Sequence, residues 1–227
     1  MRKLPVCLFL GVAAVTAAPV HGQTLADYDY ENLTFRGIGF DYGYIWPSKV
    51  ESTDHYSVRL DLGFLGPALR VTTNISYWSS DLKTQELQRL ADRLEQLPAL
   101  QEQGVDLSAE DLGQVSWSDL SLGVDAHMVW TVPLNIITYL GGGLGLHALN
   151  GRGSSIEDTF IEDLLDSTAP SLALSAGAEY QLLQRLRIYA EGRYTLLSDI
   201  RYPGVRAGVS IMLPGRPADT PLTRDAP

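Results

Sequence analysis

Apolar and polar residues alternate one by one along eight stretches of this 227-residue chain. Between Tyr56 and Phe64, every second residue is large and apolar, and Arg59 and Asp61 lie among the residues between them. Side chains of a β-strand point alternately to the two faces of a sheet, so this period of two predicts strands with one apolar and one polar face. The eight stretches are 33–46, 55–65, 69–77, 119–130, 134–149, 171–180, 186–194 and 205–213.

The polar face carries charges of both signs, which an ordinary apolar core could not hold without a large desolvation cost. Each run also has about the length that a tilted strand needs to cross a bilayer. The chain is therefore predicted to be all-β, an eight-stranded antiparallel up-and-down transmembrane β-barrel over residues 33–213 with its apolar positions facing lipid. A soluble sandwich or lipocalin-like barrel is the alternative. The candidate lumen ion-pair residues are Asp41, Arg59, Asp61, Arg70, Asp125, Glu179, Arg187, Glu191, Arg193 and Arg206, and Asp61 is expected to pair with Arg70.

The N-terminus has the pattern of an export signal. Arg2 and Lys3 precede an apolar run over residues 6–18 that is too short to span a bilayer, and small residues follow. We therefore predict a signal peptide over residues 1–22 and an N-terminal periplasmic segment over residues 23–32.

Composition narrows the possible partners and chemistry. Removing Arg2 and Lys3 with the signal takes the formal net charge from -10 to -12, which argues against nucleic acid as a partner. The only cysteine, Cys7, lies inside the predicted signal. The mature chain is therefore expected to have neither a disulfide nor a lipid anchor.

The connections between the runs alternate between tight and long, as in bacterial outer-membrane barrels with short periplasmic turns and longer external loops. Aromatic residues collect near the ends of the runs, where membrane-interface girdles are expected. These residues are Tyr44, Trp46, Tyr56, Phe64, Tyr77, Trp130, Tyr180 and Tyr194. The tight connections are 65–67, 131–133 and 182–185, and the others are 47–54, 79–114, 150–168 and 197–203.

Leucines at helical spacing between 81 and 100 predict a helical insertion in an extracellular loop, which either caps the barrel and contacts a partner or simply packs on its rim. A second short helix is expected in the acidic segment 154–163, where the carboxylates either attract divalent cations or form a solvated face. The Pro-rich tail, 214–227, is expected to be disordered.

With these features assembled, the chain resembles the small outer-membrane barrels of the outer-membrane protein A, W and X type over residues 33–213. The last run is similar to the family's C-terminal assembly signal, which the resemblance implies is read by the barrel-insertion machinery. It departs from that signal in ending on leucine in place of an aromatic residue and in continuing into a tail. The matching residues are Arg206, Gly208, Ile211 and Leu213.

The search for catalytic residues yields no active site, so we expect no enzyme, no cofactor and no metal. His127 and His147 share the inward parity but fall at opposite ends of neighbouring runs, which excludes a shared metal site. An outer-membrane deacylase would need a histidine and a serine facing lipid. Glycines 141–143 lie inside a strand run and do not form a phosphate loop.

The leading hypothesis is an outer-membrane protein with a structural or surface-interaction role and a mostly plugged polar lumen. The alternative is a narrow channel for small or hydrophobic solutes, because many inward glycines could leave space in the lumen. A lipid-modifying enzyme is a third, weaker hypothesis. The expected partners are outer-membrane lipids, lipopolysaccharide and the assembly machinery, with no nucleic acid, and the chain is expected to be a monomer.

Overall fold

The computed structural model of the chain describes residues 33–66, 68–95, 113–153 and 166–213. The predicted signal peptide, the segment 23–32, the acidic segment 154–163 and the tail 214–227 lie outside the described residues.

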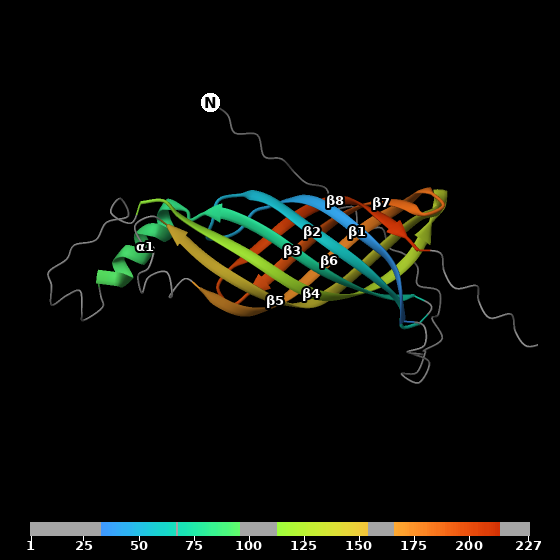
Figure 1. Cartoon of the computed structure of the whole chain (residues 1–227), viewed down its shortest axis with the longest axis horizontal. Helices are drawn as coiled ribbons and strands as arrows, with labels where there is room; N and C mark the ends of the chain where they lie inside the picture. Colours follow the sequence, from blue (N-terminus) through green and yellow to red (C-terminus); the bar gives the residue numbers. More distant parts are fainter. Residues whose placement is uncertain (1–32, 67, 96–112, 154–165, 214–227) are drawn as a thin grey trace, which may run out of the picture.

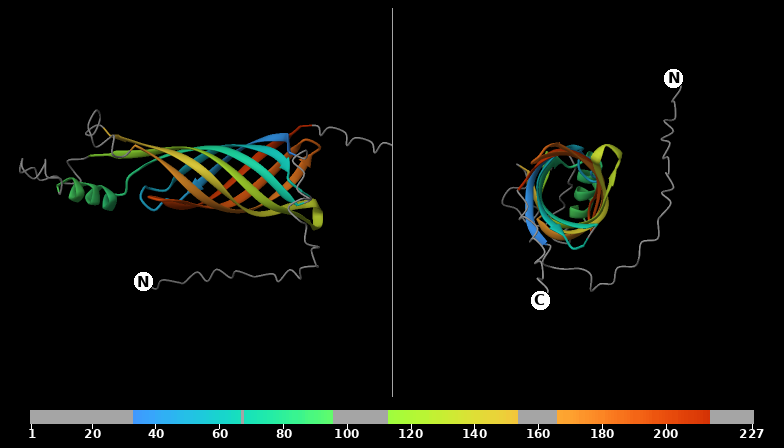
Figure 2. Two further views of the ribbon diagram at one scale, coloured as in Figure 1. Left: turned by 90° about the horizontal axis from the view of Figure 1, so that it is seen from below. Right: turned by 90° about the vertical axis from the view of Figure 1, so that its right-hand side faces the viewer.

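Eight antiparallel strands form a closed barrel in which each strand pairs with the next along the chain and β8 pairs with β1 (Figures 1 and 2). This confirms the predicted fold class. The elements are β1 Leu33–Ile45, β2 Thr53–Phe64, β3 Leu69–Asp81, α1 Thr84–Glu95, β4 Val115–Val132, the 3-10 turn Pro133–Asn135, β5 Ile136–Gly153, β6 Ser167–Leu183, β7 Leu186–Leu197 and β8 Arg201–Met212.

The strands of the central hairpin are longer than their alternating runs. β4 and β5 have 18 residues each, and β4 begins at Val115, four residues before the predicted run. The fifth run was predicted to begin at Leu134, which is wrong, because Leu134 lies in the turn before β5 with a positive φ of 69°. That turn reverses the chain within three residues, so its leucine points away from the sheet and is 82% exposed.

The connections at the two ends of the barrel differ in length. The turns after β2, β4 and β6 lie together at what we call the short-turn end. The longer connections lie at the opposite, or mouth, end, where α1 follows β3 (Figure 1). α1 extends beyond the strands at the mouth end, and in the view along the barrel axis it lies within the outline of the ring (Figure 2).

The outer wall is apolar around the whole circumference. Large side chains at alternate positions of all eight strands are exposed, although exposed apolar surface of this extent is unfavourable in water. Examples from different strands are Phe40, Tyr56, Ile75, Leu122, Leu144, Leu174, Ile188 and Val209.

α1 packs over the mouth on a cluster of buried apolar residues, which we call the mouth cluster. Leu87, Leu90 and Ala91 follow one helix face at spacings of three and four residues. Glu86 in the first turn and Arg93 in the last turn have the charges that the helix dipole favours. The cluster consists of Ile45, Val50, Trp78, Leu82, Leu90, Ala91, Val115, Trp117, Leu149, Ile200 and Tyr202.

The link into α1 is tied to the loop after β1. Val50 and Leu82 form an isolated β-bridge, and the Lys83 ammonium donates to the carbonyl of Pro47 at 2.8 Å. A helix within 81–100 was predicted, and it spans Thr84–Glu95; residues 96–100 lie outside the described part. Among the described residues, no helix is both long and apolar enough to span a membrane.

Candidate functional site

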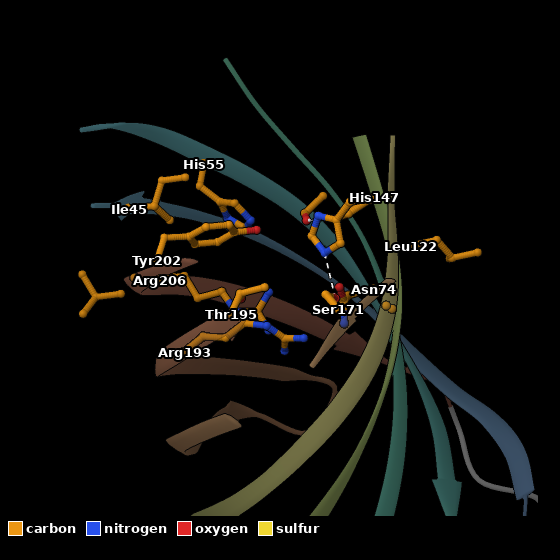
Figure 3. A pocket seen from close by; sticks show the side chains of 16 residues that line it. Ile45, His55, Asn74, Leu122, His147, Ser171, Arg193, Thr195, Tyr202 and Arg206 are labelled. Carbon is orange, nitrogen blue, oxygen red and sulfur yellow. Dashed lines mark hydrogen bonds between the residues drawn. The ribbon is translucent and has the colours of Figure 1, made fainter. Parts of the chain in front are cut away.

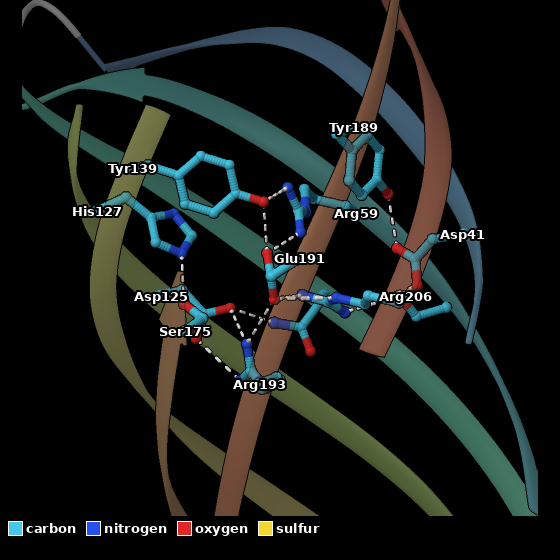
Figure 4. A network of polar contacts seen from close by, with 12 residues as sticks. Asp41, Arg59, Asp125, His127, Tyr139, Ser175, Tyr189, Glu191, Arg193 and Arg206 are labelled. Atoms are coloured by element: carbon cyan, nitrogen blue, oxygen red, sulfur yellow. Dashed lines mark hydrogen bonds and ion pairs between the residues drawn. The ribbon is translucent and has the colours of Figure 1, made fainter. Parts of the chain in front are cut away.

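A network of polar side chains centred on Glu191 of β7 lies inside the lumen (Figure 4). Its carboxylate accepts hydrogen bonds from Arg59, from the Tyr139 hydroxyl at 2.8 Å, and from Nε and Nη2 of Arg206 at 3.0 and 2.6 Å. The side chain of Glu191 has no solvent exposure. A carboxylate with this many donors is stabilised in its ionised form, since each donor to a buried charge offsets part of its lost hydration.

Two further carboxylates extend the network toward other strands. Asp125 on β4 accepts both Nη groups of Arg193 at 2.9 Å and the Asn74 amide at 2.6 Å. Asp41 on β1 accepts from Ser57 at 2.7 Å and from Tyr189 at 2.6 Å. The network therefore joins strands that are not neighbours and crosses the lumen (Figure 4).

A second ion pair lies nearer the short-turn end. Arg70 donates to Glu179 through Nη1 and Nη2 at 2.9 and 2.7 Å, and Arg187 approaches Glu179 at 3.7 Å. The expected pairing of Asp61 with Arg70 is wrong. Asp61 accepts instead from the backbone N–H of Gly63 at 2.9 Å, because Arg70 reaches the partner across the lumen.

Tyrosine rings occupy the space beside two inward glycines, Gly177 and Gly208. A Cβ on Gly177 would lie 2.5 Å from Cζ of Tyr139, and one on Gly208 would lie 2.8 Å from Cζ of Tyr189. The Arg59 guanidinium lies 5.8 and 4.3 Å from the Tyr139 and Tyr189 ring centroids. These two glycines therefore provide room for tyrosine rings that contact the ions of the network.

The inward-facing residues become apolar toward the mouth, a change that the sequence analysis did not identify. Trp78 follows the inward parity of Asn74 and Ser76 on β3, and Trp117 precedes Asp119 on β4 with the same parity. Both belong to the mouth cluster. Continuing the parity beyond the charged positions would have placed these two tryptophans inside the barrel.

Between the mouth cluster and the ion network lies a chamber with a cavity of about 30 Å³ (Figure 3). Tyr202 of the mouth cluster and Arg193 and Arg206 of the network line it on the same side (Figure 3). His147 and Ser171 lie together on a separate wall (Figure 3). A smaller cavity of about 10 Å³ beside Arg70 lies on the short-turn side.

Each of two luminal histidines is hydrogen-bonded to a serine. His127 Nε2 lies 3.0 Å from Ser175 Oγ, and His147 Nε2 lies 2.9 Å from Ser171 Oγ. The two histidines share no bonding partner, and within the described ranges no three histidine, cysteine or acidic side chains come close enough to hold a metal ion. The second pair also includes an acid, since His147 Nδ1 lies 2.7 Å from Asp119 Oδ2.

The proposed assembly-signal residues, which lie on β8 except for Leu213 directly after it, divide between the two faces. Arg206 is 6% exposed and belongs to the ion network, whereas Ile211 and Leu213 are 49% and 46% exposed on the outer wall.

Solved outer-membrane barrels share this fold. Neisserial surface protein A matches at 15% identity and a TM-score of 0.51, over 78% of this chain and 97% of that one. The N-terminal barrel domain of Pseudomonas aeruginosa OprF matches at 12% identity and a TM-score of 0.42, over 78% of this chain and 97% of that one. A major outer membrane protein from Thermus thermophilus matches at 10% identity and a TM-score of 0.44, over 78% of this chain and 99% of that one. No family profile and no curated protein sequence matches the chain. The match to Neisserial surface protein A confirms, for the fold, the resemblance to small outer-membrane barrels.

Proposed function

We propose that the protein is an integral outer-membrane barrel with a structural or surface-interaction role and a mostly plugged lumen. The observation that carries this proposal is the contrast between the two walls: exposed apolar side chains surround the barrel outside, and bonded ions fill it inside. Lipid is the solvent in which such an outer wall is favourable. Closure of β1 on β8 leaves no free strand edge, which supports a monomer.

The proposed orientation places the short-turn end in the periplasm and the mouth end outside, as connection lengths in bacterial barrels suggest. The aromatic residues Tyr44, Trp46 and Tyr194 on the outer wall would then lie near the lipopolysaccharide headgroups. α1 and the loop ends around it would form the surface that meets other molecules. Ile211 and Leu213, on the outer wall of β8, would be available to the insertion machinery during assembly.

The packing of the lumen supports a plugged barrel over the alternative of a narrow channel. The two cavities described have volumes of about 30 and about 10 Å³, and a single water molecule needs roughly 10–15 Å³. Arg59, Tyr139 and Glu191 bond to one another between these cavities. A continuous water path would require breaking these bonds.

Lipid modification at the outer wall is the third candidate, and the histidine positions argue against it. His55, His127 and His147 are all buried inside the lumen, so no histidine of the described residues faces lipid. If purified protein released acyl chains from phospholipid or lipopolysaccharide, a lipid-facing site would have to be sought elsewhere.

Cell fractionation with a gel-mobility assay tests the location and the fold together. A folded outer-membrane barrel remains compact in detergent until it is heated and then changes its mobility. We expect the protein in the outer-membrane fraction with such a heat-dependent shift. Recovery from the periplasm without detergent would contradict the proposal.

Planar-bilayer recording separates a plugged barrel from a channel. The ion network predicts no discrete openings for the wild-type protein. The matched variant Glu191→Gln keeps the side-chain volume but removes the charge that joins Arg59 and Arg206, so any conductance should appear there first. Steady openings of the wild-type protein would favour the channel.

A further inference from the structure

Ser171, His147 and Asp119 form a continuous chain of hydrogen bonds inside the barrel. Ser171 Oγ lies 2.9 Å from His147 Nε2, and His147 Nδ1 lies 2.7 Å from Asp119 Oδ2. The three side chains come from the adjacent strands β6, β5 and β4 and are 6%, 4% and 1% exposed. Strand pairing on both sides of β5 therefore holds the nucleophile, the base and the acid in fixed positions.

The bonds of His147 determine which way its protons point. A carboxylate can only accept, so Nδ1 of His147 must carry the hydrogen that is shared with Asp119. In the neutral ring this leaves Nε2 without a proton, and Nε2 then accepts the hydroxyl hydrogen of Ser171. This is the relationship that makes a serine hydroxyl nucleophilic in acyl-transfer enzymes of unrelated folds.

The other Ser–His pair lacks the acid and shows what the first pair gains. His127 Nε2 lies 3.0 Å from Ser175, but His127 Nδ1 has no hydrogen-bond partner within the described part of the chain. No bond at Nδ1 therefore keeps the proton of His127 away from Nε2, so Ser175 lacks a partner that is fixed as a proton acceptor. The barrel thus contains a complete and an incomplete version of the same arrangement.

Ser171 and His147 face the chamber, so a reacting group has a place to bind. Both line the 30 Å³ cavity together with Asn74 and Arg193 (Figure 3). Asn74 and Arg193 each have more N–H groups than their bonds to Asp125 use, and those groups are the available donors for a developing negative oxygen.

We propose that Ser171 is the nucleophile of a luminal acyl-transfer site, with His147 as general base and Asp119 as the positioning residue. Ser171 Oγ would form a bond to the carbonyl carbon of an ester while its proton passes to His147 Nε2. The ester C–O bond would then break, and His147 would return that proton to the leaving alkoxide. Water would then bond to the acyl carbon while His147 takes its proton. The bond from Ser171 Oγ to the acyl carbon would break, the acyl group would leave as a carboxylic acid, and His147 would return the proton to Ser171 Oγ.

The chamber limits the substrate to esters with a very short acyl group. About 30 Å³ accommodates roughly two water-sized groups, which corresponds to acetyl and excludes a fatty acyl chain. The mouth cluster, to which α1 contributes Leu90 and Ala91, lies above the chamber, so an ester would have to pass this cluster to reach Ser171. This site is separate from the outer wall, and it borders the ion network, to which its donors Asn74 and Arg193 belong.

Site-specific acetylation tests the proposal on the full-length folded protein in detergent. The protein is incubated with p-nitrophenyl acetate, release of p-nitrophenolate is followed, and peptide masses locate the acetyl group. We expect acetyl on Ser171 and little on Ser175 of the same molecules. Because this comparison is made within the wild-type chain, it does not depend on any variant folding.

Variants test the assigned roles, and heat-dependent gel mobility checks that each one folds. Ser171→Ala should abolish the acetylated peptide. Asp119→Asn should slow acetylation by about a hundredfold or more, because the histidine loses its fixed tautomer. Ser175→Ala should leave the rate within about twofold, since it is outside the site. Leu90→Ala, which loosens the contact of α1 with the mouth, should speed acetylation.

The proposal is overturned if neither the wild-type nor the Leu90→Ala protein becomes acetylated at Ser171. It is also overturned if folded Asp119→Asn reacts as fast as wild type, or if Ser175 reacts as readily as Ser171. None of these outcomes would affect the proposed membrane location.

Discussion

Arg70 on β3 and Glu179 on β6 form a two-point ion pair across the lumen, with N–O distances of 2.9 and 2.7 Å. Both side chains are almost completely buried, at 2% and 6% exposure. The pair therefore holds opposite walls of the barrel together at a depth where neither ion can be solvated by bulk water.

Replacing Glu179 alone with glutamine should destabilise the barrel by about 3–5 kcal/mol, because Arg70 stays buried without a counter-ion. The double variant Arg70→Met with Glu179→Met removes both charges and should recover most of the loss. Urea unfolding in detergent micelles, followed by gel mobility, measures each difference. Equal losses in the single and double variants would show that the pair itself, and not the orphaned charge, sets the stability.

Gly177 and Gly192 offer a matched test of the tyrosine packing, because both lie in paired strands. A Cβ on Gly177 would overlap the ring of Tyr139, whereas one on Gly192 would meet nothing within 4 Å. Gly177→Ala should lower the free energy of unfolding by about 1–3 kcal/mol, the usual cost of overpacking. Gly192→Ala should change it by about 0.5 kcal/mol or less. Similar losses at the two positions would contradict the proposed close packing.

Much of this arrangement follows from the alternation of residues, but the partners across the lumen do not. Parity correctly placed Leu122 on the outer wall and Arg59 inside. The sequence suggested Asp61, which is close along the chain, as the partner of Arg70. The actual partner is Glu179, and it depends on how the strands are staggered in the closed barrel.

The elements at the mouth were only partly predictable, and for a similar reason. The leucine spacing of α1 predicted a helix. The packing of this helix on the mouth depends on the inward tryptophans Trp78 and Trp117, which carry no charge to mark them as luminal residues. The triad of Ser171, His147 and Asp119 spans three strands whose register no single run specifies.

The contact of α1 with the mouth can be tested at Leu90, which is 7% exposed, against the exposed Gln85 on the same helix. Leu90→Ala should cost about 2–5 kcal/mol of local stability through the cavity that it leaves. Hydrogen exchange of the α1 amides should then accelerate, while the strand amides stay protected. Gln85→Ala should leave the exchange pattern unchanged. Unaltered exchange in the Leu90 variant would mean that the helix is held elsewhere.

If the outer wall faces lipid, the loss of stability caused by an arginine on this wall should depend on the depth of that arginine in the bilayer. Phe40→Arg, in the middle of β1 and on the outer wall, should destabilise the membrane-inserted barrel by about 2–4 kcal/mol, the cost of an arginine near the bilayer midplane. Leu134→Arg, in the turn at the short-turn end, should cost about 0–1 kcal/mol. Unfolding from phospholipid vesicles measures both. A barrel in water would tolerate the two substitutions equally.

Contact of the apolar wall with lipid is the central claim, and a spin label on Leu122→Cys tests it most directly. The mature chain has no other cysteine if residues 1–22 are removed, and Leu122 is 53% exposed near the middle of β4. Relaxation of the label is measured in reconstituted membranes with oxygen, which concentrates in lipid, and with a water-soluble nickel complex. We predict strong relaxation by oxygen and almost none by the nickel complex. Strong relaxation by the nickel complex with little effect of oxygen would place this wall in water and contradict the claim.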